Sequence, residues 1–306
     1  MDLKKEKINI ILISTSIVLF FTYILSFTNF SSTDKRKLVK SALVNSKYEK
    51  SINKFELSQG LEKLFLSKYS NNNGEIWFIT TENNEKIIPA DKEFVNNFIK
   101  KLISVINMYK VSDKVLQNNA FGLTSEDTFC LKYYFSDSEF QQIYFGNLDF
   151  SNSFRYLMSG KNTTVYQVEN TIDTYLNTKV QFWAEPNIIS KQIINISPES
   201  IQKISCSTQN TKKSFNSKTS NFYEKCYDLL SLRHGGISQL NTEILEKKSI
   251  LEIENGDKTA ITINFYKQND EFVLESIYNL NSTKVKTISK ISKWTYNKIS
   301  EIFEIN

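Results

Sequence analysis

Residues 129–168 read FCLKYYFSDSEFQQIYFGNLDFSNSFRYLMSGKNTTVYQV. Four runs rich in aromatic and β-branched residues, 129–135, 140–145, 154–158 and 164–168, are separated by short polar or glycine-containing segments. Aromatic and β-branched residues favour β-strands, whereas Ser, Asp, Asn and Gly favour turns. The stretch therefore predicts an antiparallel meander of four strands.

An amphipathic helix is expected before this meander, over residues 91–109. Asp91 follows Pro89 and Ala90, and aspartate commonly caps the first turn of a helix. Apolar side chains then recur at helical spacing, namely Phe94, Phe98, Leu102, Val105, Ile106 and Tyr109. Two alternating segments, residues 51–57 and 74–80, precede the helix and are expected to be strands.

The second half of the chain repeats this order of elements. A strand is expected at residues 200–207 and an amphipathic helix at 221–233. Four more strands, at 249–253, 260–266, 272–278 and 283–287, precede a closing helix at 291–302. The repetition suggests a duplicated α+β unit in which antiparallel sheet packs on helices, with one copy over residues 51–185 and the other over 196–306.

An apolar segment near the N-terminus, INIILISTSIVLFFTYILSFT at residues 8–28, contains no charged residue. About 20 apolar residues are enough to cross the hydrocarbon core of a bilayer. We therefore expect one transmembrane helix acting as an uncleaved signal anchor in contact with membrane lipid. A cleaved signal peptide and a buried core helix are the alternatives. Residues 1–7 would form a short cytoplasmic head and residues 29–50 a juxtamembrane connector.

The net charge is +5, with 38 basic and 33 acidic residues, and the basic excess lies near the N-terminus. Lysines and arginines flank both ends of the apolar segment, so the charge rule for orientation is nearly balanced. We expect the N-terminus inside and a single-pass protein of the bacterial cytoplasmic membrane with an extracytoplasmic body. No basic patch on the body predicts nucleic-acid binding.

The residues offer little for catalysis. His234 is the only histidine, and its place in Arg233-His234-Gly235-Gly236 after a helix indicates C-terminal capping rather than catalysis. No nucleotide-binding glycine motif is present. The acidic pairs Glu126-Asp127, Asp137/Glu139 and Asp270-Glu271 fall in expected turns, and the three tryptophans, Trp77, Trp183 and Trp294, are expected in the core. We expect no catalytic, cofactor-binding or metal-binding residues and no cofactor.

Three cysteines, Cys130, Cys206 and Cys226, have no motif spacing. An odd number cannot form a fully paired set of disulfide bonds. Pairing of Cys206 with Cys226 remains open from the sequence.

Several short motifs occur in an order that resembles a known family. They are Trp77-Phe78-Ile79, Pro89-Ala90-Asp91, Phe121-Gly122-Leu123, Tyr144-Phe145-Gly146 and Thr164-Val165-Tyr166. The chain is similar in these motifs to the bacterial domain-of-unknown-function family 4340, mainly over residues 51–189. Members resemble auxiliary components of gliding-motility-type ABC transporters, which implies ABC-type permease and ATPase subunits as partners. A polar stretch at residues 208–220 replaces the tryptophan strand that this pattern has in the second half.

These observations lead to an expected function. The chain should be a non-enzymatic, membrane-anchored, extracytoplasmic accessory subunit, of an ABC-type transporter or of a gliding or surface-export system. The alternative is a free-standing, membrane-anchored binding protein for a ligand of the cell envelope. A hydrolase is disfavoured because its motifs are missing.

Overall fold

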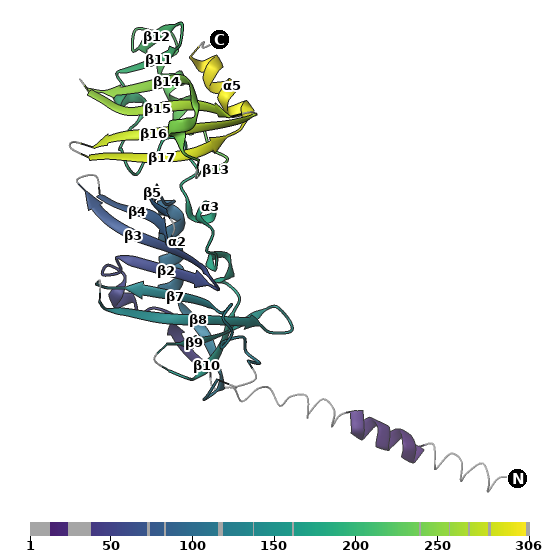
Figure 1. Ribbon diagram of the computed structural model, residues 1–306. Helices are drawn as coiled ribbons and strands as arrows, with labels where there is room; N and C mark the ends of the chain where they lie inside the picture. The colour runs from purple at the N-terminus through teal and green to yellow at the C-terminus, as the bar shows by residue number, and fades with distance from the viewer. Residues whose placement is uncertain are drawn as a thin grey trace, which may run out of the picture.

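The computed structural model describes residues 13–23, 38–71, 74–82, 84–115, 119–136, 138–160, 162–238, 240–256, 258–268, 270–280 and 283–303. The folded body consists of two antiparallel sheets that follow each other end to end (Figure 1). We call them the first unit, which contains the ten-stranded sheet, and the second unit, which contains the seven-stranded sheet.

The first sheet has the strand order β1-β6-β10-β9-β8-β7-β2-β3-β4-β5. Its strands are β1 (Leu38–Ala42), β2 (Lys54–Gln59), β3 (Glu62–Asn71), β4 (Gly74–Thr81), β5 (Asn84–Pro89), β6 (Val105–Ser112), β7 (Phe129–Tyr134), β8 (Phe140–Leu148), β9 (Phe154–Ser159) and β10 (Val165–Glu169). A short 3₁₀ helix, η1 (Ser46–Tyr48), follows β1. The predicted four-stranded meander over residues 129–168 is confirmed as β7 to β10.

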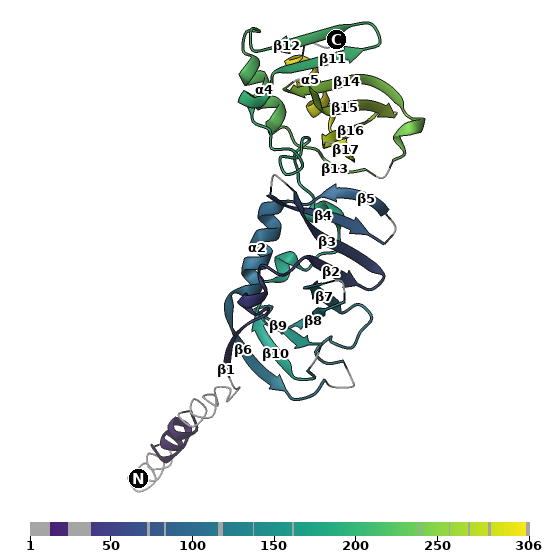
Figure 2. The same cartoon turned by 90° about the vertical axis from the view of Figure 1, so that its left-hand side faces the viewer.

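Helix α2 (Lys92–Ile103) covers the inner face of this sheet, as Figure 2 shows. Its predicted N-cap is confirmed, because the Asp91 carboxylate accepts a hydrogen bond of 3.0 Å from the Phe94 amide. Phe98 is fully buried and its ring packs 5.3 Å from Phe55 of β2 and 5.3 Å from Trp183. Burying aromatic side chains of this size dominates the stability of a core.

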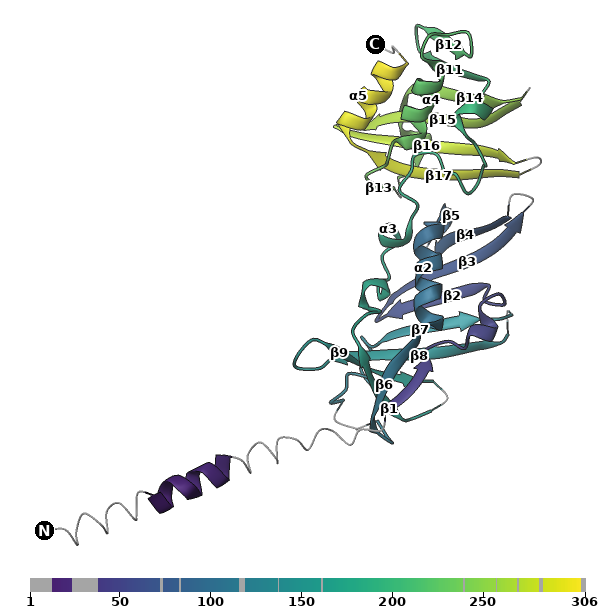
Figure 3. The ribbon, with the colours of Figure 1, turned by 180° about the vertical axis from the view of Figure 1, so that it is seen from behind.

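The second sheet has the strand order β12-β11-β14-β15-β16-β17-β13. Its strands are β11 (Lys203–Thr208), β12 (Lys212–Asn216), β13 (Gly236–Ile237), β14 (Glu246–Asn255), β15 (Lys258–Gln268), β16 (Glu271–Leu280) and β17 (Thr283–Ile291). Helices α4 (Phe222–Ser231) and α5 (Lys293–Ile302) pack on one face. Seen from behind in Figure 3, helices α2 to α5 lie on the same side of both sheets.

The two units share a strand plan. Each contains a hairpin, β2–β3 or β11–β12, with a helix later in the chain, α2 or α4. A strand after the helix, β6 or β13, pairs with the last strand of a four-stranded meander, β7–β10 or β14–β17. The first strand of each meander pairs with the first strand of its hairpin. The units differ in β1, β4 and β5, which only the first has, and in α5, which only the second has.

The units are joined through a segment that begins with η2 (Asp173–Tyr175) and α3 (Val180–Trp183), and η3 (Pro198–Ser200) lies just before β11. Beyond α3 the chain runs back along the end of β5, where Ala184 bridges to Ala90. The edge strand β5 of the first sheet and β17 of the second sheet lie next to each other across the joint (Figure 1). Ile76 and Phe78 of β4 belong to the hydrophobic cluster of the second unit, so the two cores interlock.

The expected fold class, an α+β fold with an N-terminal transmembrane helix, is wrong. The described residues form mainly antiparallel sheet, and none of their helices is long and apolar enough to cross a membrane. Residues 13–23 are helical, whereas residues 8–12 and 24–28 of the predicted span, the head at 1–7 and residues 29–37 of the connector lie outside the described residues. The prediction was based on an apolar stretch of about 20 residues, of which the described part comprises residues 13–23.

Strand content was underestimated for identifiable reasons. The predicted helix 91–109 ends at Ile103, and Val105, Ile106 and Tyr109 belong to β6, where β1 and β10 pair on either side. Two strands lie where the sequence analysis expected none, β1 in the connector and β12 in the polar stretch 208–220. Both are short edge strands of mainly polar or half-buried residues, so they carry little of the alternating apolar pattern that identifies strands. Residues 180–183 form the short helix α3.

Candidate functional site at the loop end of the first sheet

One end of the first sheet gathers the motifs that the sequence singled out. The β2–β3 turn, the segment 119–128 before β7, the β8–β9 turn and the start of β9 meet there, because their strands are neighbours in the sheet. Three cavities open at this end. The first, of about 560 Å³, is lined by residues that include Gly60, Leu123 and Tyr144. The second, of about 410 Å³, is lined by residues that include Gly146 and Arg155. The third, of about 500 Å³, lies beside the β8–β9 turn.

The Phe121-Gly122-Leu123 turn closes tightly on β8. Gly122 has a φ of +65°, a conformation that glycine adopts without strain. The Asn147 amide donates a 2.8 Å hydrogen bond to the Phe121 carbonyl oxygen, and a Cβ atom at Gly146 would collide with that same oxygen. Leu123 is buried, so the turn packs against the sheet.

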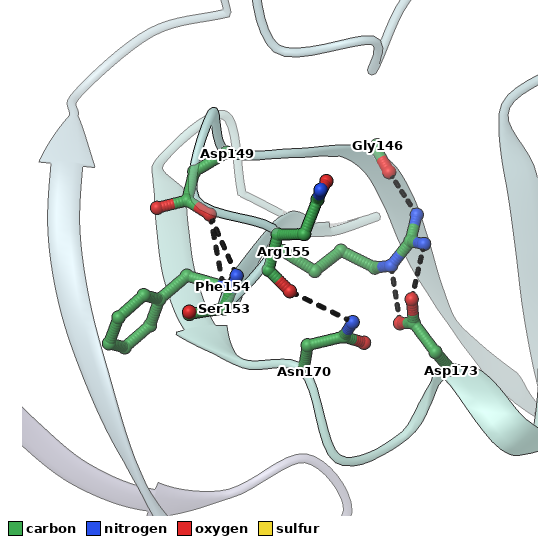
Figure 4. Close-up of polar contacts among 8 residues, drawn as sticks. Gly146, Asp149, Ser153, Phe154, Arg155, Asn170 and Asp173 are labelled. Atoms are coloured by element: carbon green, nitrogen blue, oxygen red, sulfur yellow. Dashed lines mark hydrogen bonds and ion pairs between the residues drawn. The ribbon is translucent and has the colours of Figure 1, made fainter.

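Arg155 holds the end of β9 to the segment that follows β10. Its Nε and terminal Nη2 donate to the two oxygens of Asp173 at 2.5 and 2.6 Å, and its other terminal nitrogen donates to the Gly146 carbonyl (Figure 4). Arginine suits this position because its planar fork matches a carboxylate. The ion pair is therefore a clamp between three segments of the loop end.

Asp149 organises the β8–β9 turn. Its Oδ1 accepts hydrogen bonds of 3.1 Å from the amides of Ser153 and Phe154, as Figure 4 shows, and Gln167 donates to its Oδ2 at 3.3 Å. Burial acts to raise the pKa of Asp149, but the hydrogen bonds from Phe154, Ser151 and Ser153 outweigh it and lower the pKa. The carboxylate is thus ionised and fully engaged within the turn.

His234 lies at the joint between the units, away from these cavities. Its Nε2 lies 2.7 Å from the Glu185 carbonyl oxygen, and its Nδ1 accepts from the Gly236 amide at 3.1 Å. Burial lowers the pKa of the ring. Helix α4 already ends at Ser231, so the ring joins two segments instead of capping the helix as the sequence suggested.

The Glu185 side chain is buried, and its hydrogen-bond partners are neutral donors. Its Oε2 accepts from the Ser190 hydroxyl at 2.5 Å, and its Oε1 accepts from the Lys191 amide at 3.1 Å. Weaker bonds come from Asn187 and Gln192. Burial raises the pKa of Glu185 more than these hydrogen bonds lower it. Sequence reasoning missed this residue because nothing local marks it as buried.

Two other buried glutamates are paired on the outer faces of the sheets. Glu56 accepts from Lys132 at 2.8 Å and from the Tyr134 hydroxyl at 2.6 Å. Glu275 pairs with Lys286 and accepts from Asn264 at 2.7 Å. Burial raises the pKa of both acids, but the lysine and the other donors lower it further, so both are ionised. Each is a satisfied structural pair.

The remaining residues named from the sequence are dispersed. Glu126 and Asp127 are exposed at the loop end, Glu271 pairs with Lys290 at 3.1 Å, and Asp137 lies outside the described residues. Trp77 and Trp183 are buried as expected, but Trp294 is 69% exposed.

The three cysteines are free and buried, so Cys206 and Cys226 are not paired. Burial raises the pKa of the thiols of Cys206 and Cys226 to about 12. Such thiols are poor nucleophiles at neutral pH. Among the residues that the structure describes, no group of three His, Cys, Asp or Glu side chains is placed to hold a metal ion.

A signal for the Arg155 clamp was present in the sequence. In the strand Phe154-Arg155-Tyr156-Leu157, the arginine shares a face with the buried Leu157. An arginine on a core-facing position needs a carboxylate. Its partner Asp173 could not be chosen among many acids without the register of β9 and β10.

No curated protein and no solved structure matches the chain. A family profile does match, and it spans residues 77–301, from Trp77 in β4 to the end of α5, so it covers both units. The chain therefore belongs to the family described as a domain of unknown function, DUF4340.

Proposed function

We propose that this chain is a non-enzymatic accessory subunit of an ABC-type transporter or of a gliding or surface-export system. The proposed location of its body is the extracytoplasmic side of the bacterial cytoplasmic membrane. The observation that carries the proposal is that the buried acids and the single histidine are engaged by partners inside the fold. An enzyme would need a nucleophile or base with a free face in a cavity.

The motif resemblance described in the sequence analysis supports the same role, because it implies a likeness to auxiliary components of gliding-motility-type ABC transporters. The family itself is described only as a domain of unknown function. The chain carries no nucleotide-binding motif of its own. ATP hydrolysis and the transport path would therefore belong to ATPase and permease subunits. The chain would contribute binding surface.

The β2–β3 turn offers such a surface. Leu61 is 100% exposed at its tip, and the exposed acids Glu126 and Asp127 lie in the neighbouring loop, with Asp127 close to Gly60. An isolated exposed leucine is ordinary, but one beside a loop that carries two exposed carboxylates suits a partner with an apolar pocket next to a basic group.

Co-purification tests the proposal. The full chain, tagged and extracted in mild detergent, should recover an ABC-type permease and its ATPase, identified by mass spectrometry. Leu61→Ser should reduce the recovery several-fold, whereas the matched control Ile244→Ser, 78% exposed in η4 (Thr242–Ile244) of the second unit, should not. Recovery of the chain alone, under conditions that keep a known transporter intact, would overturn the accessory role.

A second candidate is a free-standing binding protein for a ligand of the cell envelope. The 500 Å³ cavity beside the β8–β9 turn favours it, because four of its lining residues, Tyr109, Phe150, Phe154 and Tyr156, are aromatic. Cavities of this size and lining are typical of small-molecule sites. A ligand found in the purified chain without transporter subunits would favour this candidate.

A further inference from the structure

The cavity of about 500 Å³ beside the β8–β9 turn, which we call the aromatic cavity, lies on the outer face of the first sheet. The register of the strands brings its lining residues together. Tyr156 of β9 lies opposite Gln167 of β10, and Gln167 lies opposite Tyr109 of β6. Residues directly opposite one another project from the same face, and adjacent strands are about 4.8 Å apart. The two tyrosines therefore stand on either side of Gln167.

Two phenylalanines complete the walls. Phe154 is two residues before Tyr156 in β9 and so shares its face. Its ring lies 6.0 Å from that of Tyr109 at an interplanar angle of 82°, which makes a right-angled corner. Phe150, at the tip of the β8–β9 turn, lines the same cavity and is 101% exposed. Figure 4 shows the Phe154 ring and the Arg155 guanidinium on opposite sides of β9.

The charges around the cavity are negative. The Asp149 carboxylate lines it, and the exposed Glu169 of β10 lies opposite Phe154 in the register. No lysine or arginine is among the residues that line the cavity. The basic Lys40 lies farther out on the edge strand β1, opposite Asn107.

The carboxylate contributes charge without a free lone pair. Asp149 already accepts from the Ser151 hydroxyl and from the amides of Ser153 and Phe154, and its second oxygen accepts from Ser151 and Gln167. A sugar would need directional acceptors that this residue cannot supply. A cation without N–H groups needs none, because it is held by the faces of aromatic rings and by nearby negative charge.

We propose that this cavity binds a quaternary ammonium group, with Tyr109, Phe154 and Tyr156 as its walls and Phe150 as a side chain that closes over it. The group would be that of a free choline-type molecule or of a choline lipid headgroup. The inference names a ligand class for the second candidate function and does not depend on the accessory role. Failure of the co-purification would leave it intact.

Titration of the full chain with choline and with its uncharged isostere 3,3-dimethyl-1-butanol tests the proposal, with ligand-observed NMR as the readout. The two molecules have the same shape, so the difference isolates the charge. Choline should bind about tenfold more tightly, in line with the strength of cation–π contacts. Equal binding of both molecules, or no binding of choline, would overturn the proposal.

Variants locate the site. Tyr109→Leu and Phe154→Leu should each weaken choline binding about tenfold, and Glu169→Gln, on the exposed rim, should weaken it about twofold. Phe140→Leu at the other end of β8, where the ring is 42% exposed, is the matched aromatic control and should bind as the parent does. Thermal unfolding of each variant establishes that it is folded. Unchanged affinity in folded Tyr109→Leu and Phe154→Leu would overturn the assignment.

Vesicles distinguish the sources of the group. Sedimentation with phosphatidylcholine vesicles, but not with phosphatidylglycerol vesicles, and competition by free choline would support the headgroup. Binding of free choline without any vesicle association would support the soluble ligand. Equal sedimentation with both lipids, unaffected by choline, would contradict recognition of the ammonium group in a membrane.

Discussion

The Nε2 atom of His234 lies 2.7 Å from the backbone carbonyl oxygen of Glu185, so the only histidine of the chain ties the second unit to the segment leaving the first. The side chain of the same glutamate is buried among neutral donors. Ser190 extends the contact, because its amide donates to the Tyr278 hydroxyl of β16 at 2.8 Å. The joint is thus a buried polar network containing two titratable groups with opposite shifts.

Glu185→Gln should stabilise the chain at neutral pH. The pKa of Glu185 is raised by burial above 4.5, so its contribution to stability is fully present below about pH 4.5 and is lost as pH rises through the folded-state value. Glutamine removes the charge. Its carbonyl oxygen can still accept from the Lys191 amide, and its NH2 group can donate to the Ser190 hydroxyl oxygen. Urea denaturation should show a gain in stability at pH 7 that vanishes below about pH 4.5. The exposed Glu224→Gln is the control, and a loss of stability at pH 7 would contradict the assignment.

His234→Ala should destabilise the chain by about 1–3 kcal/mol at pH 8, because it leaves the Glu185 carbonyl and the Gly236 amide without their partner. Burial lowers the pKa of His234 below 6.5, so its contribution is present above that pH and is lost as pH falls through the folded-state value. The difference between variant and parent in urea denaturation should shrink towards pH 5. A pH-independent difference would show that the ring acts by packing alone.

The contributions of Arg155 and Asp173 to the free energy of unfolding should be strongly coupled. Arg155 and Asp173 are 18% and 24% exposed in their side chains, so removing one partner leaves a poorly solvated charge. Arg155→Ala and Asp173→Ala should each cost about 2 kcal/mol, and the double variant should cost less than their sum. Chemical denaturation of the four proteins in a double-mutant cycle measures the coupling. Strict additivity would mean that the pair contributes nothing.

Gly146→Ala should cost about 2 kcal/mol or more, because its Cβ would collide with the Phe121 carbonyl and push the Phe121-Gly122-Leu123 turn off β8. Gly256→Ala is a matched control. Gly256 has a φ of +70° with open space around it, so alanine there should cost only about 1 kcal/mol of backbone strain. Similar melting temperatures for the two variants would contradict the close approach of turn and strand.

The sequence was informative where local pattern and tertiary context agree. The meander of β7 to β10 was predictable because its strands alternate with polar turns, and Asp91 was predictable as an N-cap from its own chemistry. The extension of α2 into β6 was wrong because Val105, Ile106 and Tyr109 continue the helical spacing of the apolar residues before them, whereas pairing with β1 and β10 makes this segment a strand.

The candidate site was less accessible from the sequence for a related reason. Tyr109, Tyr156 and Gln167 are far apart in the chain and become neighbours only through strand register. The same holds for Arg155 with Asp173 and for Glu185 with Ser190, whose environments come from tertiary packing. Composition could show that acids and aromatics were present, but it could not show which of them face one another.

The position of Ile76 and Phe78 in the core of the second unit has a thermodynamic consequence. Neither half is a module that can be excised intact, because cutting the chain at the joint would strip these two side chains of their cover and leave a gap in the other half. Calorimetry of the whole chain should accordingly record one heat-absorption peak instead of two. Two well-separated peaks would mean that the shared core is too weak to couple the halves.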